Sequence, residues 1–125
     1  SKLGIKVIFE SDFHPLELKR LMSRLESDVF GINYDIGNSA SLGFIPFDEF
    51  EAIGDRILNV HIKDRPLGGT TVPLGEGNAD FKTVFALLKA HSYASNYILQ
   101  ASRSDNGQHL EVLNKYKKYV QYWVR

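Results

Sequence analysis

Four short β-rich runs, separated by stretches with helical spacing, constrain the fold of this chain more than any other feature of its sequence. They lie at 4–10 (GIKVIFE), 30–35 (FGINYD), 57–63 (ILNVHIK) and 97–101 (YILQA). Strands that alternate with helices are typical of a parallel sheet with helical crossovers. We therefore expect an α/β fold made of four consecutive βα units.

The helices are expected between and after these strands. They are predicted at 15–25, 47–53, 81–88 and 109–124. Pro15 and Pro46 mark the starts of the first two helices, and Asp80 is placed to cap the third. No linker or low-complexity tract divides the 125 residues, so residues 1–125 are expected to form a single domain.

Alternation of side chains within each strand predicts one apolar and one polar face. The polar face carries, at the strand ends, Glu10, Asp35, His61 and Gln100, and further back Ile57 and Asn59 among others. Parallel sheets are normally buried on both faces, so a polar face needs an explanation. A solvated side of an open sheet is one. The inner face and upper rim of a barrel explain the grouping of ionisable and amide side chains better.

Glu10, Asp35 and His61 form a plausible ligand set for a divalent cation. Carboxylate oxygens with one imidazole and no sulfur suit Mn²⁺, Mg²⁺ or Co²⁺, with Zn²⁺ as an alternative. Singly, each residue also has a structural interpretation as a rim charge, a turn former or a satisfied strand histidine. Their common face favours the metal site.

A second group of polar side chains beyond the strand ends is predicted to bind substrate. Lys63 and Arg65 follow the third strand and can contact a phosphate or hydroxyl groups, with a solvated loop as the alternative for Arg65. Arg103 follows the fourth strand, and phosphate sites in barrels often lie near the last strand ends. Asn38 and His14 are placed on the same rim.

The composition excludes several classes of function. Lys and Arg number 15, as do Asp and Glu, so no net positive charge attracts nucleic acid. With four His residues, a metallonuclease on a related barrel is set aside as well. The absence of cysteine fits a reducing compartment, and we expect a cytoplasmic protein. No apolar run reaches the roughly 18 residues of a membrane helix, so no membrane partner is expected.

Five short motifs resemble one known family. They are 34–38 (YDIGN), 60–64 (VHIKD), 74–77 (LGEG), 80–81 (DF) and 97–100 (YILQ). Together they are similar to the xylose-isomerase-like sugar phosphate isomerase/epimerase family, which has a (β/α)8 TIM barrel fold. The resemblance implies that the four βα units correspond to strands 5–8 of such a barrel, its C-terminal half.

The resemblance also implies metal ligands at the ends of those four strands, at Glu10, Asp35, His61 and Gln100. Glu10 and Gln100 would occupy the catalytic positions, but the family has a glutamate where this chain has Gln100. An amide oxygen can bind a metal but cannot accept a proton as a base. A two-base 3-epimerisation therefore lacks one base, whereas an aldose–ketose isomerisation needs only Glu10.

The expected function is that of a divalent-metal-dependent sugar or sugar-phosphate isomerase or epimerase that transfers a proton through an enediolate. The alternative is a non-catalytic carbohydrate-binding or structural half-barrel. Four βα units leave two sheet edges and one face uncovered, and such edges favour pairing. We therefore expect either a homodimer or a fragment that lacks the N-terminal half-barrel.

Overall fold

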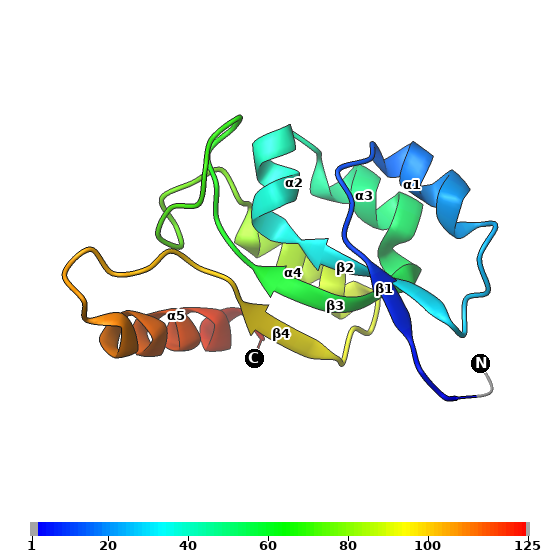
Figure 1. Ribbon diagram of the computed structural model, residues 1–125. Coiled ribbons are helices and arrows are strands. Elements are labelled where there is room, and N and C mark those ends of the chain that lie inside the picture. Colours follow the sequence, from blue (N-terminus) through cyan, green and yellow to red (C-terminus); the bar gives the residue numbers. More distant parts are fainter. Residues whose placement is uncertain (1–2, 125) are drawn as a thin grey trace.

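The computed structural model describes residues 3–124, which form one parallel sheet with helices packed against one side (Figure 1). The strands are β1 (Val7–Phe9), β2 (Phe30–Asp35), β3 (Ile57–Ile62) and β4 (Asn96–Leu99). Their order in the sheet is their order in the chain, so β1 and β4 are the edge strands. The expected α/β alternation is confirmed, although β1 is shorter than the predicted run.

In residues 3–124, five helices and one short 3-10 turn accompany the strands. They are α1 (Pro15–Met22), α2 (Ile36–Leu42), α3 (Pro46–Ile53), η1 (Gly54–Arg56), α4 (Phe81–Ala90) and α5 (His109–Val124). A proline in the first turn begins α1 and α3, and Asp80 caps α4, as predicted. Within residues 3–124, no helix combines the length and the apolar character that crossing a membrane requires.

Helix α2 is not among the predicted helices, which leave residues 36–46 unassigned. Asp35 ends β2 and also caps α2, since its Oδ1 accepts a hydrogen bond from the N–H of Asn38 at 2.8 Å. Gly43, with φ of 74°, ends the helix in the left-handed conformation that favours glycine. The strand end is therefore followed at once by a helix start.

The hydrophobic core lies between the sheet and the helices α1, α3 and α4, which lie behind the sheet in Figure 1. Its main members are Ile32, Tyr34, Val60 and Ile62 from the strands and Leu18, Met22, Phe50, Val84 and Leu88 from the helices. The strand residues alternate with Asn33, Asp35, Asn59 and His61. The polar side chains are therefore turned away from the helices, as the alternation predicted.

One irregularity in the β2–β3 pairing changes the alternation. Ile32 of β2 pairs with Ile57 of β3, and the next residue, Asn33, pairs with Asn59. Leu58 is therefore an extra residue, as in a β-bulge. Ile57 is buried in the core at 6% exposure, and Leu58 lines the open face instead. The prediction that Ile57 lies on the polar face is wrong, because the bulge shifts the alternation by one residue at this end of β3.

Beyond β3, the fully buried Asp64 organises the loop that leads to α4. Its carboxylate accepts hydrogen bonds from the backbone N–H groups of Gly75, Gly77 and Ala79 at 2.8, 3.0 and 3.1 Å. A Cβ atom at Gly77 would lie 2.1 Å from Asp64 Oδ1, so a larger residue does not fit there. One carboxylate thus fixes the path of the loop.

A second buried carboxylate, that of Glu49 on α3, lies behind β2 and is 4% exposed. Its Oε2 accepts a hydrogen bond from Tyr34 Oη at 2.7 Å, and its Oε1 accepts one from Ser39 Oγ at 2.5 Å. Burial raises the pKa of Glu49, and the two hydrogen bonds offset this only in part. Burial also raises the pKa of Tyr34 well above its usual value, and the nearby Glu49 adds to that increase.

Glu49→Gln is expected to change how the stability of the chain depends on pH. The folded chain holds the Glu49 proton more tightly than the unfolded chain, in which the carboxyl group has its ordinary pKa of 4.5. The free energy of unfolding therefore falls as the pH rises from 4.5 through the raised pKa, and the variant lacks this contribution.

Urea unfolding of wild type and Glu49→Gln gives the free energy of unfolding of each protein at several pH values between about pH 4 and pH 8. The difference between these two free energies should change with pH. Glu51→Gln, at an exposed position of the same helix, is the control and should reproduce the wild-type curve. A difference between wild type and Glu49→Gln that does not vary with pH would contradict the expectation.

Candidate metal centre

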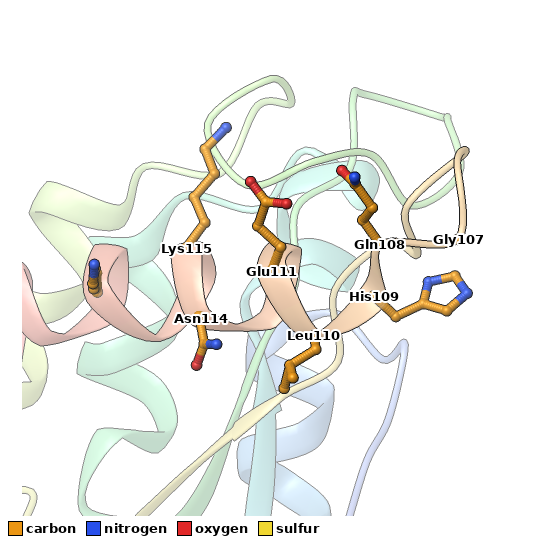
Figure 2. A pocket seen from close by; sticks show the side chains of 8 residues that line it. Gly107, Gln108, His109, Leu110, Glu111, Asn114 and Lys115 are labelled. Carbon is orange, nitrogen blue, oxygen red and sulfur yellow. The ribbon is translucent and has the colours of Figure 1, made fainter.

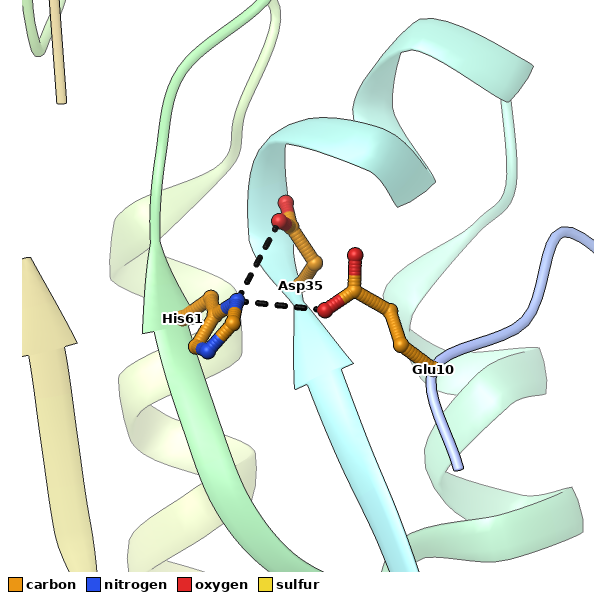
Figure 3. Close-up of side chains that lie close together, drawn as sticks. All are labelled: Glu10, Asp35 and His61. Atoms are coloured by element: carbon orange, nitrogen blue, oxygen red, sulfur yellow. Dashed lines mark ion pairs between the residues drawn. The ribbon is translucent and has the colours of Figure 1, made fainter. Parts of the chain in front are cut away.

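Three potential metal ligands meet at the carboxyl-terminal end of the sheet (Figure 3). Glu10 directly follows β1, Asp35 ends β2, and His61 of β3 is the residue paired with Asp35. His61 Nδ1 lies 3.1 Å from Glu10 Oε2 and 3.7 Å from Asp35 Oδ2. The structure thus brings together three of the four predicted ligands, each from a different strand end.

The geometry of this triad fits a divalent cation. One ligand atom from each residue lies within 4.8 Å of the other two. A cation bound at roughly 2.1 Å from each atom would bring such atoms to about 3–4 Å from one another, which small side-chain movements provide. The donor set of two carboxylates and one imidazole, without sulfur, suits Mn²⁺, Mg²⁺, Co²⁺ or Zn²⁺.

Asp35 supplies a further indication of a cation. Its Oδ2 is buried and has no hydrogen bond within residues 3–124. Lys63 Nζ lies 3.0 Å from this oxygen and forms an ion pair with it, but the orientation is not that of a hydrogen bond. The Lys63 charge offsets the cost of burying this carboxylate oxygen, but the oxygen still has no hydrogen-bond donor and keeps a lone pair free. An oxygen with spare coordinating capacity therefore points into the triad.

Two buried asparagines, placed on the polar face by the strand alternation but given no role by it, support the triad. Asn59 Nδ2 donates a hydrogen bond to Asn33 Oδ1 at 2.6 Å. Asn33 Nδ2 in turn donates to Glu10 Oε2 and lies 3.1 Å from His61 Nδ1. Because Asn59 occupies the amide oxygen of Asn33, the NH₂ group of Asn33 faces the triad. The sequence could have indicated this supporting role, because each asparagine lies two residues before a strand-end ligand and therefore on the same face of its strand.

Three of the predicted substrate-binding residues lie beside the triad. Asn38 Nδ2 donates to Glu10 Oε1 at 3.1 Å. Its Oδ1 accepts a hydrogen bond from Arg65 Nη1 at 2.8 Å and lies 3.4 Å from Lys63 Nζ. Arg65 also donates through Nε and Nη2 to the carbonyl of Gly69, at 2.9 and 2.7 Å. Asn38 therefore connects the triad to the loop after β3.

The other three predicted residues lie apart from the triad. Gln100 continues the pairing beyond β4, because its N–H donates to the Ile62 carbonyl at 3.0 Å. Its side chain is exposed and makes no hydrogen bond to the triad in the described part of the chain. Arg103 is exposed in the loop before α5. His14 Nδ1 accepts the Leu16 N–H at 3.4 Å and caps α1. Roles of these residues toward a ligand stay predictions.

The open face of the sheet forms a groove that ends at the triad. Its lining includes Ile8, Leu58, Asn59, Asn96 and Ile98 together with Glu10 and His61. Ile8 is 42% exposed and Ile98 is 46% exposed. The groove therefore combines a polar end, where the triad lies, with exposed apolar side chains from both edge strands.

A hollow at the start of α5 is separate from this groove (Figure 2). Gln108, Glu111 and Lys115 extend on one side of the helix, and Leu110 and Asn114 extend on the other. The hollow is lined by one helix and the two residues before it, so a ligand would be held from one side only. None of the predicted site residues lines it.

Comparison with known proteins identifies the family of this chain. The family model described as xylose isomerase-like TIM barrel matches residues 3–119. Inosose dehydratase of Clostridium tetani is 28% identical in an alignment covering 84% of this chain and 42% of that enzyme. L-Ribulose-5-phosphate 3-epimerase of Salmonella paratyphi C is 35% identical in an alignment covering 61% of this chain and 27% of that enzyme.

A solved structure shows the same fold. The crystal structure of a xylose isomerase domain protein from Planctomyces limnophilus superposes with a TM-score of 0.78 at 17% identity. The superposition covers 96% of this chain and 46% of that one, and the chain spans less than half the length of the curated relatives it matches. With a family match over nearly its whole length, this chain belongs to the xylose isomerase-like TIM barrel family.

Proposed function

We propose that this chain carries the metal-binding half of a divalent-metal-dependent sugar or sugar-phosphate isomerase or epimerase. The observation that supports this most strongly is the convergence of Glu10, Asp35 and His61, with a buried Asp35 oxygen that lacks a hydrogen bond. Two relatives named as an inosose dehydratase and a ribulose-phosphate epimerase support chemistry on sugars and related polyols. We assign β1–β4 to strands 5–8 of the (β/α)8 barrel.

Glu10 is the proposed base. Its side chain is 37% exposed, so a substrate in the groove can reach it. Hydrogen bonds from the amide groups of Asn33 and Asn38 orient its two oxygens. A base at this position removes a proton next to a carbonyl, which leaves an enediolate, and then returns the proton to the neighbouring carbon. A bound Mn²⁺, Mg²⁺ or Co²⁺ supplies Lewis-acid polarisation of the substrate oxygens.

The proposed substrate contacts surround the triad at the strand ends. Lys63 and Arg65 carry positive charge next to Asn38, and these three side chains already form one connected group. Arg103 is the proposed contact for a phosphate at the end of β4, and His14 is a further proposed contact on the same rim as Asn38. Sugar hydroxyls and phosphate oxygens are the acceptors that such donors bind.

Gln100 bears on the choice of reaction. Its amide oxygen can serve as a fourth metal ligand, but the group cannot exchange a proton as a carboxylate does. A single-base aldose–ketose isomerisation can use Glu10 as its base, whereas a two-base 3-epimerisation needs a second base that Gln100 does not provide. We favour the isomerisation on this ground.

Mn²⁺ is expected to raise the melting temperature of the chain. A ligand that binds only the folded state stabilises it by about 2.7 kcal/mol at a hundred times its dissociation constant. Asp35→Ala and His61→Ala should abolish this increase, because each removes one ligand of the triad. Differential scanning fluorimetry of the three proteins with and without Mn²⁺ measures the effect.

Proton transfer is measured separately, by NMR of a substrate incubated in D₂O with Mg²⁺ and either wild type or Glu10→Gln. A ketose phosphate should exchange the hydrogen next to its carbonyl for deuterium in the presence of wild type and not with Glu10→Gln. Asp105→Asn, in the exposed loop before α5, is the control and should behave as wild type. Wild type that neither gains thermal stability from metal nor exchanges deuterium would refute the proposal.

A non-catalytic half-barrel that binds carbohydrate or self-associates is the second candidate. The exposed apolar side chains on the open face, Ile8 and Ile98, favour association through that face. In the described part of the chain, β1 and β4 each pair on one side only. A second copy related by a two-fold axis along the strands would pair β4 of each copy with β1 of the other, in the parallel sense that both sheets already have.

Light scattering after size-exclusion chromatography at micromolar concentration should give a dimer or larger species. Ile98→Asp should shift the equilibrium toward monomer, since it places a charge on the face that would be buried. Leu42→Asp, at an exposed position of α2, is the matched control and should leave the mass unchanged. A wild-type monomer that unfolds cooperatively would contradict self-association.

A further inference from the structure

The buried carboxylate of Glu49 forms hydrogen bonds with the residues on either side of the segment from Asp35 to Asn38. Its Oε2 accepts from Tyr34, the residue before Asp35, and its Oε1 accepts from Ser39, the residue after Asn38. The two oxygens of one side chain therefore hold both ends of the segment 34–39.

This segment carries one triad ligand and the side chain that contacts another. Asp35 contributes Oδ2 to the triad, and its Oδ1 accepts the Asn38 N–H at 2.8 Å. The Asn38 side chain in turn donates to Glu10 Oε1. A displacement of the segment away from α3 would therefore move Asp35 and would loosen Glu10 as well.

The surroundings of Glu49 make its presence costly for stability. It is 4% exposed beside Phe50 and Ile53 of the core, and burial raises its pKa. Apolar replacements of buried charged networks are often neutral or stabilising, so stability alone gives little reason for a carboxylate here. Glu49 and the two triad carboxylates, Glu10 and Asp35, moreover line the same small hollow between α3 and the end of β2.

We propose that Glu49 is a positioning residue for the metal centre, which through Tyr34 and Ser39 holds Asp35 and Asn38 in the geometry that binds the cation. This inference rests on the proposed function, in that the triad must bind a divalent metal. In the described residues, Glu49 forms no hydrogen bond or ion pair with the triad, and it does not line the groove. Its effect is carried by the two hydrogen bonds and the short backbone segment between them.

The dissociation constant for Mn²⁺, measured by titration calorimetry on the folded chain, tests the proposal. Glu49→Leu should weaken Mn²⁺ binding by roughly tenfold or more, the range seen when the partners that orient metal ligands are removed. Tyr34→Phe and Ser39→Ala each remove one of the two bonds and should weaken binding severalfold. These two variants keep the test informative if Glu49→Leu does not fold.

Glu49→Gln is the conservative variant that separates positioning from charge. Its amide oxygen can accept from Tyr34 and its NH₂ group can donate to Ser39 Oγ, so the bridge is kept without the charge. Mn²⁺ affinity close to that of wild type is expected. Affinity as low as that of Glu49→Leu would overturn the proposal, because the carboxylate charge rather than the bridge would then be responsible.

Two controls separate positioning from loss of stability. Val84→Ala, on the buried face of α4, should lower the melting temperature of the metal-free chain and leave Mn²⁺ affinity unchanged. Glu51→Gln should change neither quantity. If wild type binds no Mn²⁺, the proposed function fails. If wild type binds Mn²⁺, and Ser39→Ala, Tyr34→Phe and any folded Glu49→Leu bind it equally well, only the positioning role is wrong.

Discussion

The candidate metal centre depends on the register in which β2 pairs with β3. Parallel strands bring their carboxyl ends to the same edge of a sheet, but the register decides which side chains meet there. The extra residue in β3, Leu58, sets this register. Without it, the pairing that begins at Ile32 with Ile57 would place Asp35 opposite Val60, whose side chain belongs to the core. With it, Asp35 lies opposite His61.

The same register makes a polar layer tolerable inside the sheet. Asn33 and Asn59 are 6% and 8% exposed, and they face each other only because the bulge aligns them. The Asn59 amide donates to the amide oxygen of Asn33, and the NH₂ group of Asn33 in turn donates to Glu10 and lies beside His61. A slip by one residue would leave buried amides opposite apolar side chains at a cost of several kcal/mol, on the order of the net stability of many domains. Correct strand pairing and an assembled triad are therefore two consequences of the same contacts.

Much of this architecture follows from the local sequence pattern, and the exceptions have a common cause. Alternation within strands predicted that Asp35 and His61 share a face, and the helix starts at Pro15, Pro46 and Asp80 follow from capping chemistry. The bulge at Leu58 could not be predicted in this way, because it depends on the pairing of β3 with β2, a strand distant in sequence. The role of Asp64 was missed for the same reason, since its backbone partners lie 11, 13 and 15 residues away. Glu49, expected on a helix with no special part, pairs with a strand residue 15 positions earlier.

The ligand beside the edge strand is the most exposed of the three. The side chain of Asp35 is 1% exposed, that of His61 is 19% exposed and that of Glu10, beside the edge strand β1, is 37% exposed. The two ligands on the central strands are thus already shielded, whereas Glu10 lies where a further strand would pack. Electrostatic interactions strengthen as water is excluded, so covering this edge would affect Glu10 most. The proposed metal binding through Asp35 and His61 therefore depends less on cover at this edge than the proposed proton transfer by Glu10 does.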